Sequence, residues 1–173
     1  MKQTALITGA SRGIGAALAE TFARAGYQLT LCCQHSEEKL MTLASRLQEQ
    51  YHTTVLVRIG DVGDYAFVKA MVDETLEAFG AIDVLINNAG ISYIGLLTDM
   101  SIEDWNRIVA TNLTSVFSTC RCVVPSMVHN KRGRIINISS VWGNVGASCE
   151  VAYSACKGGI NSFTRALGKE LAP

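Results

Sequence analysis

The stretch Thr8-Gly-Ala-Ser-Arg-Gly-Ile-Gly15 joins an apolar run to a segment whose apolar residues recur at helical spacing. In such a strand-to-helix turn, Gly9, Gly13 and Gly15 allow the backbone to approach a pyrophosphate at the helix N-terminus. Their spacing differs from GxGxxG, the commonest dinucleotide pattern, and glycines in a tight turn can also be purely structural. The stretch therefore predicts a strand–helix unit with a candidate dinucleotide site.

Outward from this turn, strand and helix patterns alternate along the chain. Mostly apolar, β-prone runs occupy residues 4–8, 28–33, 54–59, 84–87 and 134–138. Strands that are buried on both faces have this continuous apolar character. Because helical patterns lie between them, we expect right-handed crossovers and an α/β fold, a parallel sheet with helices on both faces.

Two longer helices are expected in the second half of the chain. One begins at the capping-box pattern of residues 101–104 and runs through Asn112 to about residue 128. The last helix runs from about residue 152 to about residue 171. No linker or repeat interrupts these patterns, so residues 1–173 are predicted to form one domain.

Composition excludes several classes of partner. Fifteen Lys and Arg balance fifteen Asp and Glu, so no net charge attracts the chain to nucleic acid or to an anionic membrane. The first apolar stretch is too short for a signal peptide or a membrane span, which predicts a cytoplasmic protein. The three histidines lack metal-ligand spacing, and the six cysteines are expected to be buried free thiols.

Three side chains have the chemistry needed to reduce a carbonyl group. Ser140 precedes Tyr153 by thirteen residues, and Lys157 follows Tyr153 by one helical turn on the same helix face. A hydride that reaches a carbonyl carbon leaves negative charge on the oxygen, which needs a proton donor and a hydrogen-bond donor. Tyr153 and Ser140 are suited to these tasks, and a neighbouring lysine favours the phenolate.

These motifs, in this order, resemble the short-chain dehydrogenase/reductase family over the whole chain. The matching residues are Thr8-Gly-x-x-x-Gly-Ile-Gly15, Asp61, Asn87-Asn-Ala-Gly90, Asn112, Ser140 and Tyr153-x-x-x-Lys157. The resemblance implies a Rossmann-like, doubly wound parallel sheet with strand order 3-2-1-4-5. It also implies an NAD(P)-dependent oxidoreductase that acts on CH–OH or C=O groups.

The resemblance also assigns site residues. The implied catalytic residues are Ser140, Tyr153, Lys157 and Asn112, with Asn112 holding a helix kink and a water that leads to Lys157. The implied cofactor-binding residues are Gly9, Ser11, Arg12, Gly13, Ile14, Gly15, Asp61, Asn88, Ala89, Gly90, Tyr153 and Lys157. Asp61 would accept a hydrogen bond from the adenine amine, and residues 88–90 would lie along the adenosine ribose. For Asn87 we prefer a structural role, in which its amide ties neighbouring strands together.

The sequence favours NADPH over NADH. NAD-selective relatives place a carboxylate at the end of the second strand, whereas residues 32–36 contain none before Glu37. Arg12 lies in the glycine turn, where similar reductases direct a cation to the 2′-phosphate. The alternative is that Arg12 is a solvated loop residue and Glu37 reaches the ribose.

The substrate is expected to meet an apolar pocket at the carboxyl ends of the strands. Its candidate lining residues are Tyr93, Ile94, Trp142, Val145, Cys149 and Glu150. The chain resembles 3-oxoacyl-acyl-carrier-protein reductases, and the basic cluster Lys131, Arg132 and Arg134 either meets an acidic carrier protein or is a solvated turn.

Residues 140–153 are instead more similar to elongation factor P 5-aminopentanone reductases. A carboxylate at Glu150, beside Tyr153, would pair with a substrate amine, which an acyl thioester lacks. The alternative is that Glu150 faces water at the rim of the site.

Relatives of this family continue past residue 173 with a sixth strand, a segment that covers the substrate and a seventh strand. We therefore expect the last two family strands to be missing from residues 1–173, and an exposed apolar edge at residues 134–138. A further reading is a truncated dinucleotide-binding module without efficient catalysis. Helices 112–128 and 152–171 resemble those that form the family's tetramer interface, so a homo-oligomer is expected.

Overall fold

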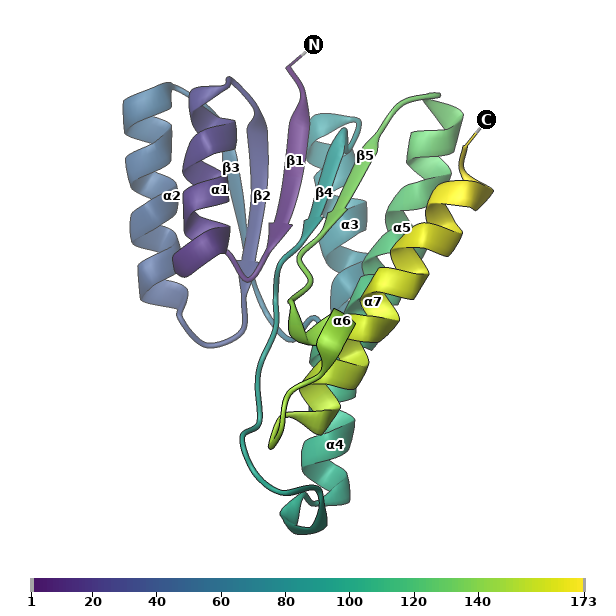
Figure 1. The fold of residues 1–173 in the computed structure, drawn as a ribbon. Coiled ribbons are helices and arrows are strands. Elements are labelled where there is room, and N and C mark those ends of the chain that lie inside the picture. Colours follow the sequence, from purple (N-terminus) through teal and green to yellow (C-terminus); the bar gives the residue numbers. More distant parts are fainter. Residues whose placement is uncertain (1, 173) are drawn as a thin grey trace.

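The computed structural model describes residues 2–172 and contains one five-stranded parallel sheet with strand order β3-β2-β1-β4-β5 (Figure 1). The strands are β1 (Thr4–Thr8), β2 (Gln28–Cys33), β3 (Val55–Ile59), β4 (Val84–Asn87) and β5 (Arg134–Asn137). The helices are α1 (Gly13–Arg24), α2 (Glu37–Tyr51), α3 (Tyr65–Phe79), η1 (Leu97–Asp99), α4 (Ile102–Val109), the π-helical turn η2 (Ala110–Thr114), α5 (Ser115–His129), α6 (Trp142–Val145) and α7 (Val151–Glu170). The predicted fold class and strand order are confirmed.

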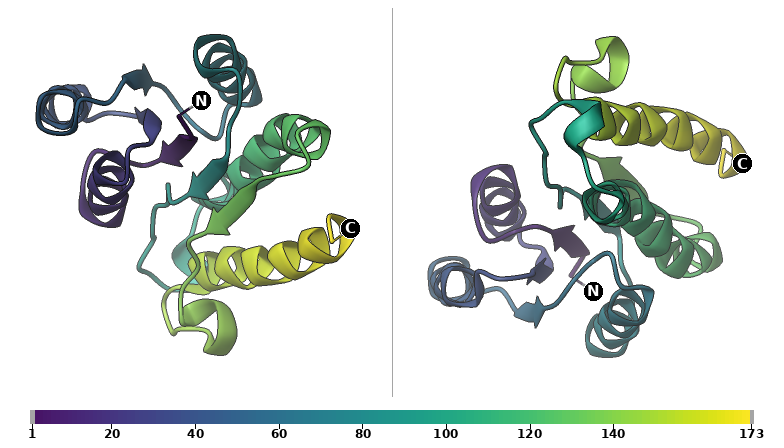
Figure 2. Two further views of the ribbon diagram at one scale, coloured as in Figure 1. Left: turned by 90° about the horizontal axis from the view of Figure 1, so that it is seen from above. Right: turned by 90° about the horizontal axis from the view of Figure 1, so that it is seen from below.

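Each face of the sheet has its own apolar core, and the helices form a layer on both sides (Figure 2). Side chains alternate along β1, so Ala5 and Ile7 pack toward α1 and α2, while Leu6 packs toward α3, α5 and α7. All five residues of β1 are buried because two layers cover this central strand. This double coverage explains why the strand sequences are continuously apolar.

The long helical region after β4 is less regular than its sequence pattern indicates. Ser101 caps α4 by accepting a hydrogen bond from the Asp104 amide at 3.0 Å, as the capping-box pattern predicts. The π-helical turn η2 then interrupts the region before α5 begins at Ser115. The expected last helix is confirmed as α7, whereas the short helix α6 lies in a segment that was expected to be a loop.

A buried carboxylate fastens the amino ends of three strands. Asp83 precedes β4 and is 5% exposed. It accepts a hydrogen bond from the Thr4 amide at 2.9 Å and forms an ion pair with Arg132 Nε at 3.0 Å. The starts of β1 and β4 and the turn before β5 are thereby joined at the edge of the sheet opposite the glycine turn.

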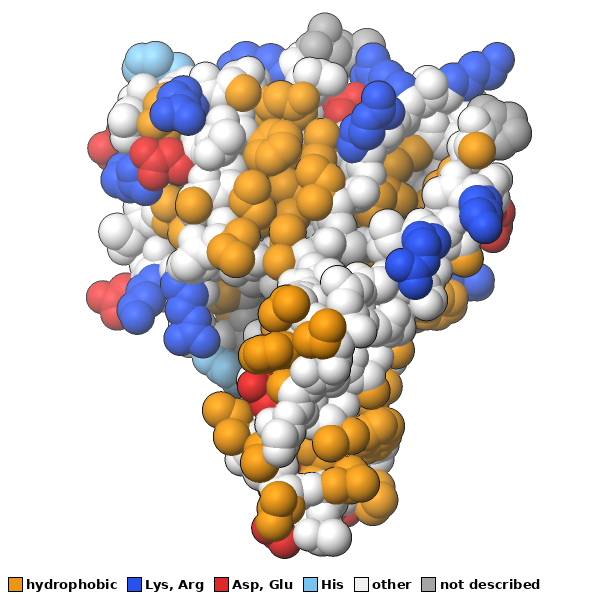
Figure 3. All heavy atoms as spheres, in the orientation of Figure 1, with side chains coloured by type: hydrophobic (Ala, Val, Ile, Leu, Met, Phe, Trp, Pro, Cys, Tyr) orange, Lys and Arg blue, Asp and Glu red, His pale blue; other side chains and the backbone are white. Residues whose placement is uncertain are grey.

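β5 forms one edge of the sheet. Ile136 on this strand is 41% exposed, and Figure 3 shows apolar side chains on the surface between α1 and α7. A groove of about 960 Å³ lies along the strand, between the end of α5 and the end of α7. The expected apolar edge is therefore present, with the strand ending at Asn137.

All six cysteines are free thiols, as expected, but only four are buried, since Cys122 and Cys149 are partly exposed. Burial raises the pKa of Cys32 to about 12 and that of Cys120 to about 11, so neither is a reactive thiolate at neutral pH. Among residues 2–172, no helix is both long and apolar enough to cross a membrane.

Candidate active site

The glycine turn packs tightly against the segment that follows β4. A Cβ atom at Gly15 would lie 2.3 Å from the Gly9 carbonyl oxygen, and one at Gly9 would lie 2.8 Å from the Ala89 Cα. Both contacts are with backbone atoms, and shifting the backbone to relieve such a clash would be energetically costly. Gly9 and Gly15 are therefore required by the packing of the turn itself.

Gly13 differs from the other two glycines of the turn. It has a positive φ of 55°, and a Cβ atom placed on it would meet nothing within 4 Å. Gly13 is the first residue of α1, whose first backbone N–H groups have no partner within the helix. Open space beside these donors fits the pyrophosphate of a dinucleotide. Arg12, Gly13 and Ile14 are all exposed at this opening.

Asn88 and Thr8 join the two loops behind this opening. The Asn88 side-chain amide donates to the Thr8 carbonyl at 3.1 Å and to the Gly9 carbonyl at 3.0 Å. The Thr8 hydroxyl accepts hydrogen bonds from the backbone amides of Asn88 and Ala89, at 3.0 and 3.1 Å. Asn88 therefore shapes the glycine turn through its side chain, a role that sequence reasoning did not assign to it.

Asn87 has the structural role that was preferred for it. Its amide nitrogen donates to Asn137 Oδ1 on β5 at 2.8 Å, and its amide oxygen accepts from the Thr119 hydroxyl on α5 at 2.7 Å. Asp61 follows β3, and its Oδ1 accepts from the Gly63 amide at 2.8 Å. Asp61 thus begins a turn at the carboxyl edge of the sheet, after β3, which β2 separates from β1 and the glycine turn.

Two serines follow β5, and they have different environments. The Ser139 hydroxyl donates to the Lys157 carbonyl on α7 at 3.2 Å. The Ser140 hydroxyl accepts from the Trp142 amide at 3.2 Å, where it begins α6. As an acceptor in this contact, the Ser140 hydroxyl keeps its own proton to donate, whereas the Ser139 proton is already used. This difference agrees with the choice of Ser140.

Tyr153 and Lys157 lie one turn apart on α7. The Lys157 Nζ is 5.5 Å from the centroid of the Tyr153 ring and donates to the Ile138 carbonyl at 2.7 Å. Lys157 is only 3% exposed, and burial lowers its pKa. Tyr153 is partly exposed at the start of the same helix. A buried ammonium beneath a more accessible phenol is an arrangement that can stabilise a phenolate.

Asn112 lies in the π-helical turn and is fully buried. Its Oδ1 accepts from the Ile91 amide at 2.8 Å, and its Nδ2 donates to the Ile91 carbonyl at 2.7 Å. A Cβ atom at Gly90 would be 3.3 Å from Asn112 Oδ1 and 3.7 Å from Lys157 Nζ. The structure therefore brings Asn112, Lys157 and the segment after β4 to one place. The predicted kink is the π-helical turn.

Two contacts connect the loop after β4 with the loop before α7. The Ser92 hydroxyl donates to Glu150 Oε2 at 2.8 Å, and the Gly95 amide donates to the Cys149 carbonyl at 2.9 Å. Around these loops, several large apolar side chains are more than half exposed, namely Ile94, Leu96, Leu97, Val141 and Val145. This end of the molecule therefore presents an apolar surface next to Tyr153.

Comparison with known proteins agrees with this geometry. A family profile described as short chain dehydrogenase matches residues 3–173. The chain belongs to the short-chain dehydrogenase/reductase family. As a member of this family, the chain is an NAD(P)-dependent oxidoreductase.

Two relatives of this short-chain dehydrogenase/reductase are bacterial proteins. The chain is 36% identical to the uncharacterized oxidoreductase YmfI of Bacillus subtilis, over 100% of this chain and 70% of the relative. It is 37% identical to the 3-oxoacyl-[acyl-carrier-protein] reductase FabG of Staphylococcus aureus, over 99% of this chain and 70% of that protein. A crystal structure of a metagenomic short-chain oxidoreductase in complex with NADP superimposes with a TM-score of 0.94 at 34% identity, over 98% of this chain and 76% of that one.

The basic cluster of this short-chain dehydrogenase/reductase lies away from its site. Lys131, Arg132 and Arg134 are at the amino end of β5, whereas Ser140 follows its carboxyl end. Arg132 is also paired with the buried Asp83. The sequence left two readings of this cluster, a contact for an acidic carrier protein or a solvated turn. Its place at the amino edge of the sheet means that such a contact would lie away from Ser140 and Tyr153.

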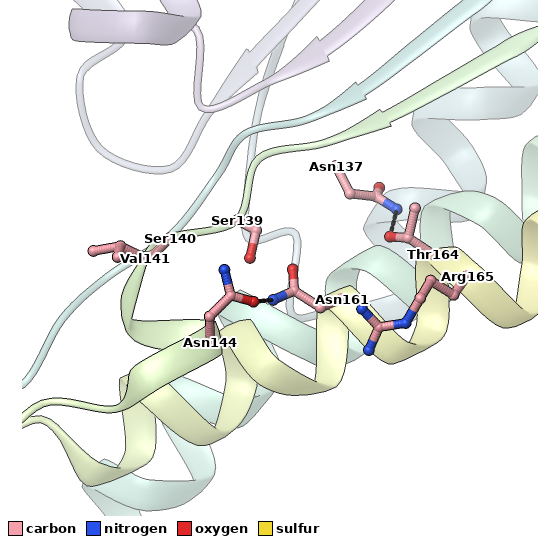
Figure 4. Close-up of a pocket in the computed structure, with 8 residues that line it drawn as sticks. All are labelled: Asn137, Ser139, Ser140, Val141, Asn144, Asn161, Thr164 and Arg165. Carbon is pink, nitrogen blue, oxygen red and sulfur yellow. Dashed lines mark hydrogen bonds between the residues drawn. The ribbon is translucent and has the colours of Figure 1, made fainter.

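A polar groove of about 460 Å³ adjoins Ser140 on the side of α6 and α7 (Figure 4). It is lined by Asn137, Ser139, Ser140, Val141, Asn144, Asn161, Thr164 and Arg165. Most of its amides are bonded to one another or to hydroxyls, as in the pair Asn144–Asn161 at 2.9 Å and the pair Asn137–Thr164 at 2.9 Å. Ser140 lines this groove, whereas Tyr153, Lys157 and Asn112 do not, so the groove shares one residue with the predicted catalytic set.

Proposed function

We propose that this chain is an NADPH-dependent carbonyl reductase that transfers hydride from the nicotinamide to a ketone. The observation that carries the proposal is the buried Lys157, held by the Ile138 carbonyl at 2.7 Å and placed next to the Tyr153 ring. Burying an ammonium group is costly, so its retention here favours a chemical role. The open glycine turn, at the same edge of the sheet, supports the use of a dinucleotide.

The residues at this edge fit the cofactor. The first turn of α1 would hold the pyrophosphate, and Arg12 would meet the 2′-phosphate. Asp61 would accept from the adenine amine, residues 88–90 would lie along the adenosine ribose, and Lys157 would bind the nicotinamide ribose. When bound, the cofactor supplies the hydride. NADP in the metagenomic relative supports the choice of NADPH.

The remaining residues would stabilise and protonate the negative charge that develops on the substrate oxygen. Tyr153 would donate the proton, and Ser140 would donate a hydrogen bond to the same oxygen. The Lys157 ammonium stabilises the phenolate that remains. Asn112 fixes the backbone of Ile91 and would hold the water that leads to Lys157. Together these roles complete the proton transfer that must accompany hydride transfer.

The decisive variant is Tyr153→Phe, which removes the proton donor and keeps the ring. We expect turnover to fall by about 10²-fold or more, because a positioned acid contributes about 10²–10⁴-fold. NADPH affinity, measured by fluorescence titration, should change little. Tyr27→Phe is the matched control, since Tyr27 packs its ring against Phe22 and precedes β2, at the opposite edge of the sheet. Retained turnover in Tyr153→Phe would sink the assignment.

For the substrate, we propose a 3-oxoacyl thioester carried on acyl carrier protein. The apolar surface around Ile94 and Val145 suits an acyl chain, and the FabG relative acts on such a substrate by name. In this proposal the enzyme serves fatty acid biosynthesis in the cytoplasm, as a homotetramer. The test is NADPH oxidation with an acetoacetyl thioester. If NADPH binds and neither this thioester nor an amino-ketone substrate is reduced, the chain is a dinucleotide-binding module without efficient catalysis.

A second candidate substrate is the amino-ketone group of elongation factor P carrying 5-aminopentanone. Glu150, three residues before Tyr153, has no cationic partner among residues 2–172 and is oriented by Ser92 at 2.8 Å. A carboxylate held in this way is suited to pair with a substrate amine.

Glu150→Gln separates the two candidates. If the amine is paired, kcat/KM for an amino-ketone substrate should fall about 10-fold or more, as for loss of a charge-assisted hydrogen bond. Reduction of the acetoacetyl thioester should be unchanged. Ser92→Ala, which loosens Glu150 and keeps its charge, should have a smaller effect on the same substrate. Equal effects on both substrates would assign Glu150 to the loop structure alone.

A further inference from the structure

Three consecutive residues at the end of β5 each bond helix α7. The Asn137 side-chain amide donates to the Thr164 hydroxyl at 2.9 Å (Figure 4). The Ile138 carbonyl accepts from Lys157 Nζ at 2.7 Å, and the Ser139 hydroxyl donates to the Lys157 carbonyl at 3.2 Å. The end of β5 is therefore bonded to α7 at two places, Lys157 and Thr164, which lie about two helical turns apart.

The bond at Thr164 affects where Tyr153 lies. The proposed catalytic groups come from different elements, since Ser140 follows β5 and Tyr153 is on α7. Apolar packing of α7 against the sheet is non-directional, whereas hydrogen bonds fix an orientation. With Lys157 as a pivot, Tyr153 lies four residues to one side and Thr164 seven residues to the other. A tilt of α7 that moves Thr164 therefore moves Tyr153 by roughly half as much in the opposite direction.

The Asn137 side chain is held in one orientation by its two partners. Its Oδ1 accepts from the Asn87 amide nitrogen at 2.8 Å, so its Nδ2 faces Thr164. The Thr164 hydroxyl donates its single proton to the Ile160 carbonyl at 2.7 Å, which leaves its oxygen to accept from Asn137. Donors and acceptors thus match along the whole series, and Asn137 connects β4 with α7.

We infer that Asn137 is a positioning residue, which fixes α7 through Thr164 and thereby holds Tyr153 in place relative to Ser140. The inference rests on the proposed reductase function and adds a residue that touches neither substrate nor cofactor. A misplacement of about 1 Å in an active site can lower the rate about 10²-fold. The glycine turn belongs to β1 and α1, so the affinity for NADPH should depend little on Asn137.

The first test is Thr164→Val, which keeps the shape of the side chain and removes the acceptor. The assay is reduction of the acetoacetyl thioester or the amino-ketone substrate, whichever the wild type reduces. The value of kcat is expressed per NADPH-binding site, counted by fluorescence titration, so that unfolded chains do not contribute. We expect kcat to fall about fivefold or more, with the affinity for NADPH unchanged. Thr164→Ser keeps the hydroxyl and should retain the wild-type kcat.

Thr42→Val is the matched control for Thr164→Val. The Thr42 hydroxyl also donates to a carbonyl four residues earlier in a helix, that of Glu38 at 2.9 Å, but it lies on the exposed face of α2. The two substitutions therefore remove the same kind of bond within a helix, and only one of them breaks a bond to β5. Thr42→Val should leave kcat unchanged.

The second test removes the donor of the same bond. Asn137→Ala should lower kcat about tenfold or more, because it also removes the acceptor that Asn87 bonds. The double variant with Thr164→Val should lose no more than Asn137→Ala alone, because both substitutions remove one interaction.

The outcomes separate this inference from the proposed function. If the wild type reduces a ketone and Thr164→Val retains its kcat, the inference is overturned and the proposed function stands. The inference is also overturned if the two losses multiply in the double variant, or if NADPH affinity falls in parallel with kcat, because Asn137 would then support the sheet alone. If the wild type reduces neither substrate, the proposed function falls and the inference falls with it.

Discussion

At the residue scale, the most consequential side chain is Lys157. Its folded-state pKa lies below the ordinary value of 10.5, because burial disfavours the charged form. Between the lowered pKa and 10.5, the unfolded chain binds more protons than the folded chain. The free energy of unfolding contributed by Lys157 therefore rises with pH across this window, and it is lowest below it.

This leads to a prediction for Lys157→Met. The wild-type free energy of unfolding should rise relative to that of the variant when urea denaturation is compared at about pH 7 and about pH 10. The Met side chain has a similar length and cannot titrate, so the difference isolates the lysine. Lys169→Met, at the exposed end of α7, is the control and should run parallel to the wild type. Parallel profiles for Lys157→Met would refute the pKa shift.

The relative positions of two residues could be predicted from the sequence where both belong to one short motif. The Tyr153–Lys157 spacing places both residues on one helix face, and the structure places them so. The role of Asn88 could not be predicted, because its partners are the Thr8 and Gly9 carbonyls about eighty positions earlier in the chain. A sequence pattern gives no sign of a hydrogen bond over that separation.

At the scale of elements, the π-helical turn η2 connects a helix to the active site. In this turn, the Asn112 side chain bonds both the amide and the carbonyl of Ile91. Ile91 lies in the irregular segment after β4, so these two hydrogen bonds satisfy backbone groups that have no partner in a helix or strand. Helical periodicity predicted one continuous helix here. The segments before and after the π-helical turn are each amphipathic, and a turn with one additional residue leaves no separate sequence signal between them. The helix α6 was also missed, since four residues are too few to show a period.

Asn112→Ala tests this connection. We expect the free energy of unfolding to fall by about 2 kcal/mol, from two lost hydrogen bonds of about 1 kcal/mol each. Turnover should fall as well, because the segment bearing Gly90 and Ile91 loses its support. Asn144→Ala, which removes an exposed amide pair with Asn161, is the comparison and should cost less than half as much. Comparable losses in the two variants would contradict the assigned role.

At the scale of the whole molecule, two apolar surfaces offer different ways to associate. One lies on α4 and α5, where Ile102, Trp105 and Phe117 are 71%, 36% and 49% exposed. The other is the β5 edge with Ile136. Monomeric proteins seldom expose large contiguous apolar patches, so we expect residues on α4 and α5 to meet a second copy of the chain.

Light scattering on size-exclusion fractions tests this expectation. The wild type should have a mass above that of a monomer, and Phe117→Lys should lower it by placing a charge in the helical interface. Ile136→Lys should leave the mass unchanged. If Ile136→Lys alone lowers the mass, the copies associate through the β5 edge, as unpaired strands tend to do. A monomeric wild type would exclude both routes.

The order of the strands was predictable because the family motifs fall at the ends of successive strands. The position of the basic cluster in the fold could not be predicted, because a pattern of charges does not state which end of a parallel sheet it occupies. Only the register of β4 with β5 places Arg134 beside Val84, at the edge opposite Ser140. The fold thus follows from periodicity, whereas the arrangement of surfaces depends on the completed sheet.

The clamp formed by Asp83, Thr4 and Arg132 has a consequence for biosynthesis. β1 is made first yet occupies the middle of the sheet, so its side facing β4 has no partner until residues 84–87 have been translated. The Asp83 carboxylate is then made well before its guanidinium partner. At about 5–20 residues per second, the ribosome needs roughly 2–10 s to advance from residue 83 to residue 132. During that interval the Asp83 carboxylate of the nascent chain has no guanidinium partner, and the sheet is incomplete. We expect a chaperone to be most useful to the nascent chain during these seconds.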